Sequence, residues 1–307
     1  MASNLTTSRL QTFTISITPF TQDGALDEDA FTQHLTRLAQ GGVGVYVGGG
    51  GSGEGYTLSF DETARLLELA AGTLKGKTPI RAMGTEPRTA RQMIEFLNLA
   101  EDKGVDAAQV YSLDVGHGHV PTPNELANYF GEVFSNSSLP LVLSTHQSVG
   151  YVIPAPVIIE LFEKHANLIG LNISHQDPNY LKTLVDALGE RADICVGGPH
   201  QAPMVLALGG HGYLSSEGNL APNLCRSVIE AAKVGDNTLF LDRWGKLLRL
   251  FMALYGNGGI RVTKAVLGEF GLPGGFPRLP RLPVERDALD RAMKVVKEIG
   301  LAEIEGW

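Results

Sequence analysis

The chain has 307 residues, of which 43% are hydrophobic and 19% charged, which is enough to bury a large core. Its net charge of −8 argues against a surface that neutralises phosphates or coats an anionic membrane, so we expect neither a nucleic-acid partner nor a membrane partner. No segment resembles a secretion signal or a membrane span, and two cysteines are too few for a disulfide framework, which together favour a cytoplasmic protein.

Short apolar runs alternate along the chain with longer segments of helical periodicity, and no linker interrupts the alternation. This pattern is typical of βα units that build a parallel sheet. The expected strands cover residues 12–17, 44–48, 79–83, 107–112, 140–145, 168–173, 193–197 and 212–216.

A helix is expected after each strand, and the clearest helix signal is the capping box from Ser59 to Glu62. Eight consecutive units predict a (β/α)8 TIM barrel, an α/β fold. An open doubly wound sheet also fits the alternation, but it gives no reason to stop at eight units. We place the barrel in residues 1–220, and we place its last helix and a C-terminal helical extension in residues 221–307, packed with it as one domain.

The active sites of such barrels lie at the C-terminal ends of the strands, where this chain has Ser144 and Asn172. An amide can neither attack a carbonyl nor take up a proton, so we expect Asn172 to donate a hydrogen bond to a substrate oxygen or to orient a histidine.

The loop after the second expected strand is rich in glycine, but it lacks the ending of a P-loop and the spacing of a dinucleotide fingerprint. We therefore expect no nucleotide cofactor. Its Gly51 and Ser52 suit a carboxylate, which backbone amides and the hydroxyl would hold. A tight turn without a ligand is the alternative.

Five of the eight histidines directly follow strands four to seven, which favours a role in general acid and base catalysis. They are His117, His119, His146, His175 and His200, with Asp114 beside the first two. The last three follow neighbouring strands and could converge on a divalent metal such as zinc, iron or manganese. Alternatively, each ring only bonds to the backbone of its own loop.

Several segments resemble, in combination, the dihydrodipicolinate synthase and N-acetylneuraminate lyase family across nearly the whole chain. The segments are ITPF at 17–20, DGALDEDAF, GSGE with LSFDE, LGGHGYLSSEGNLAPNL at 208–224, and VTKAVLGEFG. The resemblance implies a barrel with a helical extension, assembly into a homo-oligomer (tetramer or dimer), and lyase chemistry on 2-oxo acids.

The residues that define the family's reaction differ in this chain. The family's Schiff-base lysine ends a glycine-isoleucine-lysine sequence on strand six, where this chain has Asn172. The family's strand-five tyrosine falls at Ser144 or Leu143, and its arginine after strand five falls near Ser148. Its tyrosine after strand four falls near Val115.

We therefore expect a lyase, either an aldolase or a hydro-lyase, that acts on a small carboxylate or 2-oxo acid without a Schiff base. The expected catalytic residues are His146, His175, His200, Asn172 and Ser144, and the expected substrate-binding residues are Gly51, Ser52, Asp114, His117 and His119. The alternatives are a metal-dependent hydrolase or lyase on the same barrel, with the metal on the three later histidines, and a catalytically silent protein that binds an oxo acid or sugar acid.

Overall fold

All eight expected strands are present in the computed structural model, which describes residues 9–307. The expectation of no leader segment falls partly on residues 1–8, which lie outside the described part of the chain. The strands are β1 (Gln11–Ile15), β2 (Gly44–Val47), β3 (Ile80–Ala82), β4 (Ala107–Val110), β5 (Leu141–Ser144), β6 (Leu168–Ile173), β7 (Asp193–Val196) and β8 (Gly212–Ser215).

The eight strands are parallel and form a closed barrel in chain order, which confirms the predicted (β/α)8 TIM barrel. Most of their residues are fully buried on both sides, as expected for strands covered by helices. The register aligns Ser144 of β5 with Asn172 of β6, so both predicted site residues end neighbouring strands at the same level.

The chain divides into two compact units by its internal contacts: residues 9–10 with 81–214, and residues 11–80 with 215–307. We call them the first unit and the second unit and describe each by itself. They do not test the expected division at residue 220, which stays a prediction.

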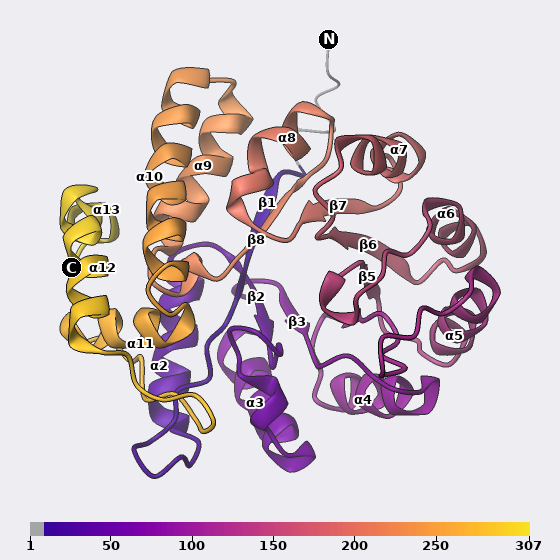
Figure 1. The fold of residues 1–307 in the computed structure, drawn as a ribbon, viewed down its shortest axis with the longest axis horizontal. Helices are drawn as coiled ribbons and strands as arrows, with labels where there is room; N and C mark the ends of the chain where they lie inside the picture. Colours follow the sequence, from indigo (N-terminus) through magenta and orange to yellow (C-terminus); the bar gives the residue numbers. More distant parts are fainter. Residues whose placement is uncertain (1–8) are drawn as a thin grey trace. The chain divides into compact units, whose positions relative to one another are not determined.

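In the first unit, helices α4 to α7 run along the outside of strands β4 to β7 (Figure 1). Threonine or aspartate side chains cap three of these helices, since Thr89, Thr122 and Asp177 each accept a hydrogen bond from a first-turn N–H group. The helices of the unit are α4 (Ala90–Asp102), α5 (Pro123–Ser135), α6 (Ala155–Lys164), α7 (Pro178–Leu188) and α8 (Ala202–Ala207).

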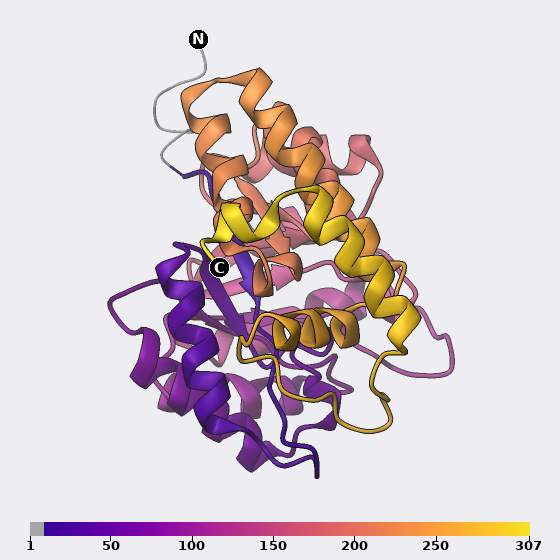
Figure 2. The ribbon, with the colours of Figure 1, turned by 90° about the vertical axis from the view of Figure 1, so that its left-hand side faces the viewer.

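The second unit holds the C-terminal helical extension, in which α10 packs beside α9 and α12 (orange and yellow in Figure 2). The predicted capping box at Ser59 and Glu62 is confirmed at the start of α3. The helices of the unit are α2 (Glu28–Gln40), α3 (Phe60–Leu74), α9 (Pro222–Val234), α10 (Asn237–Tyr255), α11 (Ile260–Glu269), α12 (Arg286–Glu298) and α13 (Leu301–Glu305). Within residues 9–307, no helix combines the length and the apolarity that crossing a bilayer would require.

Candidate active site

The end of β6 in the first unit carries a buried pair of side-chain amides. Nδ2 of Asn172 donates a hydrogen bond to Oε1 of Gln109 on β4 across 2.6 Å, and both side chains are almost completely buried. Neither amide ionises near neutral pH, so the pair can offer hydrogen bonds but cannot act as a nucleophile or a base. Asn172 is thus a strand-end residue as predicted, and its partner Gln109 is one that the sequence did not indicate.

Ser144 lies beside this pair and is likewise buried. Its carbonyl oxygen accepts a long hydrogen bond of 3.4 Å from Oγ of Ser112. Tyr151 donates to the carbonyl of Leu113 across 2.8 Å, and burial raises the pKa of the Tyr151 phenol to about 12. Because this phenol stays protonated and donates its hydrogen to Leu113, Tyr151 stabilises the loop after β4.

His146, directly after β5, takes part in a relay with a serine and a carboxylate. Its Nδ1 lies 2.7 Å from Oγ of Ser148, which in turn donates to Oε1 of Glu86, and the two ends of the relay are 3.5 Å apart. A hydroxyl has one hydrogen, and Ser148 gives that hydrogen to Glu86, so the hydrogen between His146 and Ser148 must come from Nδ1. The backbone N–H of Ser148 also points at Nδ1 across 3.2 Å, and this approach is a hydrogen bond only in the tautomer whose Nδ1 carries no hydrogen.

Two consequences follow for this relay. With Nδ1 protonated, the neutral ring carries its lone pair on Nε2, which is the arrangement of a general base oriented by a carboxylate. The nearby imidazole of His146, whose Nδ1 lies 3.5 Å away, and then the hydrogen bond from Ser148 lower the pKa of Glu86 to about 2, so Glu86 is ionised at neutral pH. Glu86 follows β3, and sequence reasoning missed it because it stands four residues beyond the strand end.

His175 and His200 have separate local partners. The N–H of Asp177 donates to Nδ1 of His175 across 3.0 Å, and the His175 ring packs against the Tyr180 ring with centroids 4.9 Å apart. The His200 ring lies over Gly198, where a Cβ atom would come 2.7 Å from Nδ1, and burial lowers the pKa of His200.

The three histidines predicted as metal ligands do not come together. Among residues 9–307, no group of three or more histidine, cysteine, aspartate or glutamate side chains could hold a metal ion. The prediction of a metal centre at His146, His175 and His200 is therefore corrected: each of the three loops turns its ring toward partners of its own. Binding of a divalent cation elsewhere stays a prediction.

Asp114, His117 and His119 form an exposed turn after β4. Oδ1 of Asp114 accepts the N–H of Gly116 across 2.9 Å, and the other carboxylate oxygen lies 3.8 Å from Arg88. His117 adopts a positive φ of 51°, which few side chains tolerate, and His119 closes the turn by donating its N–H to Gly116. The carboxylate of Asp114 is thus committed to the turn, and a substrate-binding role for the three residues stays a prediction.

In the second unit, the glycines of the loop after β2 have two kinds of surroundings. A Cβ atom at Gly53 or Gly55 would collide with the backbone of Gly48 and Gly49 at 2.1–2.9 Å, so these glycines let the loop fold on itself. At Gly51, by contrast, a Cβ atom would meet nothing within 4 Å. The alternative of a tight turn therefore explains part of the loop and leaves the surroundings of Gly51 open.

Ser52 follows Gly51 and is 5% exposed. Its Oγ lies 2.6 Å from Oγ of Ser216, which follows β8, and Ser216 accepts a hydrogen bond of 3.3 Å from the hydroxyl of Tyr255. Neither Ser216 nor Tyr255 was predicted as a site residue, because nothing in the sequence links the end of α10 to the glycine loop.

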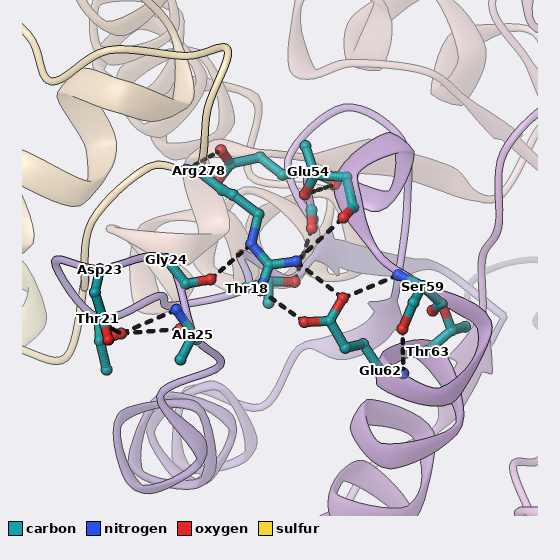
Figure 3. A network of polar contacts seen from close by, with 12 residues as sticks. Thr18, Thr21, Asp23, Gly24, Ala25, Glu54, Ser59, Glu62, Thr63 and Arg278 are labelled. Atoms are coloured by element: carbon teal, nitrogen blue, oxygen red, sulfur yellow. Dashed lines mark hydrogen bonds and ion pairs between the residues drawn. The ribbon is translucent and has the colours of Figure 1, made fainter.

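Glu54 anchors the same loop through a buried ion pair. It pairs with Nζ of Lys264, and Oε1 accepts the backbone N–H of Arg278 across 3.1 Å. Figure 3 shows Arg278 between Glu54 and Glu62, and its guanidinium donates to both carboxylate oxygens of Glu62 at 2.7 and 2.9 Å. These contacts hold the segment after α11 against the loop and give Glu54 a structural role.

Lys264 is the one lysine among residues 9–307 whose side chain is buried. Burial lowers its pKa to about 8. Its ammonium nitrogen donates to the carbonyls of Thr18 and Phe276 at 2.8 Å and to Glu54. All three hydrogens of the group are engaged, so Lys264 stabilises this unit and has no free lone pair for attack.

A model of the Dihydrodipicolinate synthetase family matches residues 9–299. A 4-hydroxy-tetrahydrodipicolinate synthase of Methanopyrus kandleri is 27% identical over 287 residues, covering 93% of this chain and 94% of that protein. An uncharacterized DapA-like lyase of Thermofilum pendens is 28% identical, covering 93% and 95%.

The fold agrees with this match. A crystal structure of a prophage protein of the dihydrodipicolinic acid synthase family from Escherichia coli, in complex with pyruvate, superposes with a TM-score of 0.87 at 22% identity and covers 95% of this chain and 99% of that chain. The chain belongs to the dihydrodipicolinate synthetase family and, as a member of it, is a lyase.

Proposed function

We propose that this lyase acts on a small carboxylate, such as a 2-oxo acid, without forming an imine between the protein and its substrate. The reaction is either cleavage of a carbon–carbon bond or addition and removal of water. The observation that carries the proposal is the amide of Asn172, bonded to Gln109, at the strand end where the family resemblance implies a lysine.

Within residues 9–307, no lysine elsewhere in the structure is suited to imine formation. A nucleophilic lysine needs a desolvated position and a free amine. None of the eight strands contains a lysine, and the buried Lys264 is engaged by three acceptors.

His146 supplies the base for the proposed chemistry. Its Nε2 lone pair accepts a proton from the carbon next to the substrate carbonyl, which leaves an enolate. Nδ1 keeps its hydrogen on Ser148, and the ionised Glu86 stabilises the imidazolium that forms. The proton returns from Nε2 to carbon or to a leaving oxygen in the second half of the reaction.

Two experiments test this proposal. Incubation with pyruvate and sodium borohydride, followed by mass spectrometry of the intact protein, should give no covalent adduct, because no imine forms. Exchange of the methyl hydrogens of pyruvate for deuterium, followed by NMR, should be catalysed by the wild-type protein and lost in His146→Ala. His165→Ala serves as the matched control, since His165 ends helix α6.

A reduced adduct on any lysine would overturn the imine-free mechanism. Undiminished exchange in His146→Ala would show that His146 is not the base that takes up the substrate proton. The names of the relatives favour a 4-hydroxy-tetrahydrodipicolinate synthase activity as the alternative. The tetrameric or dimeric state and the cytoplasmic location of the protein stay predictions.

A further inference from the structure

We infer that Tyr255 and Ser216 are positioning residues that make the hydroxyl of Ser52 a hydrogen-bond donor toward a substrate carboxylate. The inference rests on the proposed function for the class of ligand. It adds two residues from the C-terminal half of the chain to the glycine loop.

Three hydroxyl groups form a chain within the second unit. Tyr255 is the last residue of α10, Ser216 follows β8, and Ser52 lies in the loop after β2. The distance between the oxygens is 3.3 Å from Tyr255 to Ser216 and 2.6 Å from Ser216 to Ser52.

The direction of the chain follows from counting hydrogens. Tyr255 donates its only hydrogen to Ser216. The geometry of the short contact allows either serine to donate, because a hydroxyl oxygen has two lone pairs. We assign Ser216 as the donor, because its hydrogen has no other acceptor among the described residues. Ser52 accepts in this contact, so its hydrogen is directed elsewhere.

The surroundings of that hydrogen suit an anion. The backbone N–H groups of Gly51 and Ser52 donate to no other group in the described part of the chain. The space beside Gly51 is open, and Nη1 of Arg281 lies 3.4 Å from the Gly51 carbonyl, which adds positive charge. A hydroxyl and two amides that all present hydrogens match the acceptor-only oxygens of a carboxylate.

The two buried glutamates of the unit, Glu54 and Glu217, do not oppose an anion at this place. Glu54 is neutralised by its ion pair with Lys264. Burial raises the pKa of Glu217, which favours its uncharged form.

Without the hydroxyl of Tyr255, the direction of the hydrogen bond between Ser216 and Ser52 is no longer fixed. Ser216 could then accept from Ser52, and the Ser52 hydroxyl would spend part of its time pointing away from the ligand. The Tyr255 side chain thus acts through two other groups and does not need to touch the substrate.

The test measures pyruvate binding by calorimetry for the wild-type protein and for Ser52→Ala, Tyr255→Phe and the double variant. We expect about tenfold weaker binding for Ser52→Ala and about three- to tenfold weaker binding for Tyr255→Phe. The double variant should match Ser52→Ala alone, since Tyr255 acts only through Ser52. Binding of pyruvamide, which lacks the carboxylate charge, should be the same in all four proteins.

Ser227→Ala is the control for the loss of a hydroxyl, because Ser227 lies on α9 of the same unit, donates to the carbonyl of Leu224 and lies outside the hydroxyl chain. Ser216→Ala should reproduce the effect of Tyr255→Phe, and Ser216→Thr, which keeps the hydroxyl, should rescue it. This pair keeps the inference testable if Tyr255→Phe lowers the melting temperature.

Additive effects of the two single substitutions would overturn the inference, as would pyruvate binding by Tyr255→Phe at wild-type strength. Failure of the wild-type protein to bind pyruvate, 2-oxobutanoate and 2-oxoglutarate would overturn it as well. If the coupled binding effects appear but no proton exchange occurs, the inference holds and the proposed catalytic function fails.

Discussion

Asn172 on β6 and Gln109 on β4 share a hydrogen bond of 2.6 Å, although β5 separates their strands in the sheet. The two side chains therefore reach past β5 on the same side of the sheet, where the register pairs Gln109 with Val142 and Asn172 with Ser144. The amide pair is neutral and has a fixed orientation. Its position at the strand end where the family resemblance implies a lysine is the reason for the imine-free proposal.

Substitution of Gln109 by Ala should destabilise the protein through this bond. It leaves a buried N–H group of Asn172 without its acceptor, which costs about 1–3 kcal/mol in the free energy of unfolding. Asn172→Ala should cost a similar amount, and the double variant should cost less than the sum of the two. Urea unfolding of all four proteins measures this coupling, and strict additivity would show that the bond does not form in solution.

Substitution of Glu86 by Gln should weaken both stability and catalysis. The pKa of Glu86 is lowered to about 2 from the ordinary value of 4.5, so its stabilising contribution is present above about pH 4.5 and is lost as the pH falls through 2. Since the side chain is partly exposed, we expect a loss of about 1–2 kcal/mol at pH 7. The kcat should fall by about 10- to 100-fold, because the carboxylate no longer supports His146 as a base.

Glu95→Gln provides the control for charge, since Glu95 lies on helix α4 of the same unit and pairs only with its neighbour Arg91 across 3.7 Å. Equal pH dependence of unfolding for the Glu86 and Glu95 variants would refute the relay.

The sequence predicts strand ends well, because apolar runs bounded by polar residues mark them directly. It therefore located Ser144, Asn172 and His146 at the mouth of the barrel. The side-chain partners of these residues could not be predicted from the sequence. Glu86 and Gln109 meet His146 and Asn172 only through contacts between side chains 60 and 63 residues apart, as counted from the sequence numbers.

The failure of the predicted metal centre has a similar physical origin. Histidines that follow neighbouring strands start close together, but each loop then satisfies its own backbone. His175 accepts the N–H of Asp177 at the start of α7, and His200 sits in the short helical turn Pro199–Gln201. The spacing of strand ends therefore limits where a ring begins and does not decide where it points.

Breaking the buried ion pair of Glu54 and Lys264 should be severe. Removing either partner leaves a charge in a site that is 0–1% exposed, which costs about 3–5 kcal/mol. Glu54→Gln and Lys264→Met should each lower the melting temperature strongly, and the combined substitution should be less damaging than the sum. Calorimetric melting of the three variants checks this. Exposed Glu285→Gln is the control, and a mild effect of Lys264→Met would mean that water reaches the pair.

Glu217 should make the stability of the protein fall with rising pH. Its side chain is 1% exposed, Oε2 accepts a hydrogen bond of 2.8 Å from Ser215, and Oε1 has no partner among the described residues. Burial raises the pKa above the ordinary 4.5, so between that value and the folded pKa the native state holds a proton that the unfolded chain has lost. The free energy of unfolding therefore decreases as the pH rises from 4.5.

Glu217→Gln stays neutral at every pH and should remove this decrease, so that its stability relative to the wild-type protein grows from pH 4.5 to pH 8. Urea unfolding across that range measures the difference, with Glu285→Gln as the variant of equal charge. A constant difference between wild type and Glu217→Gln would mean that Glu217 is ionised in the folded protein.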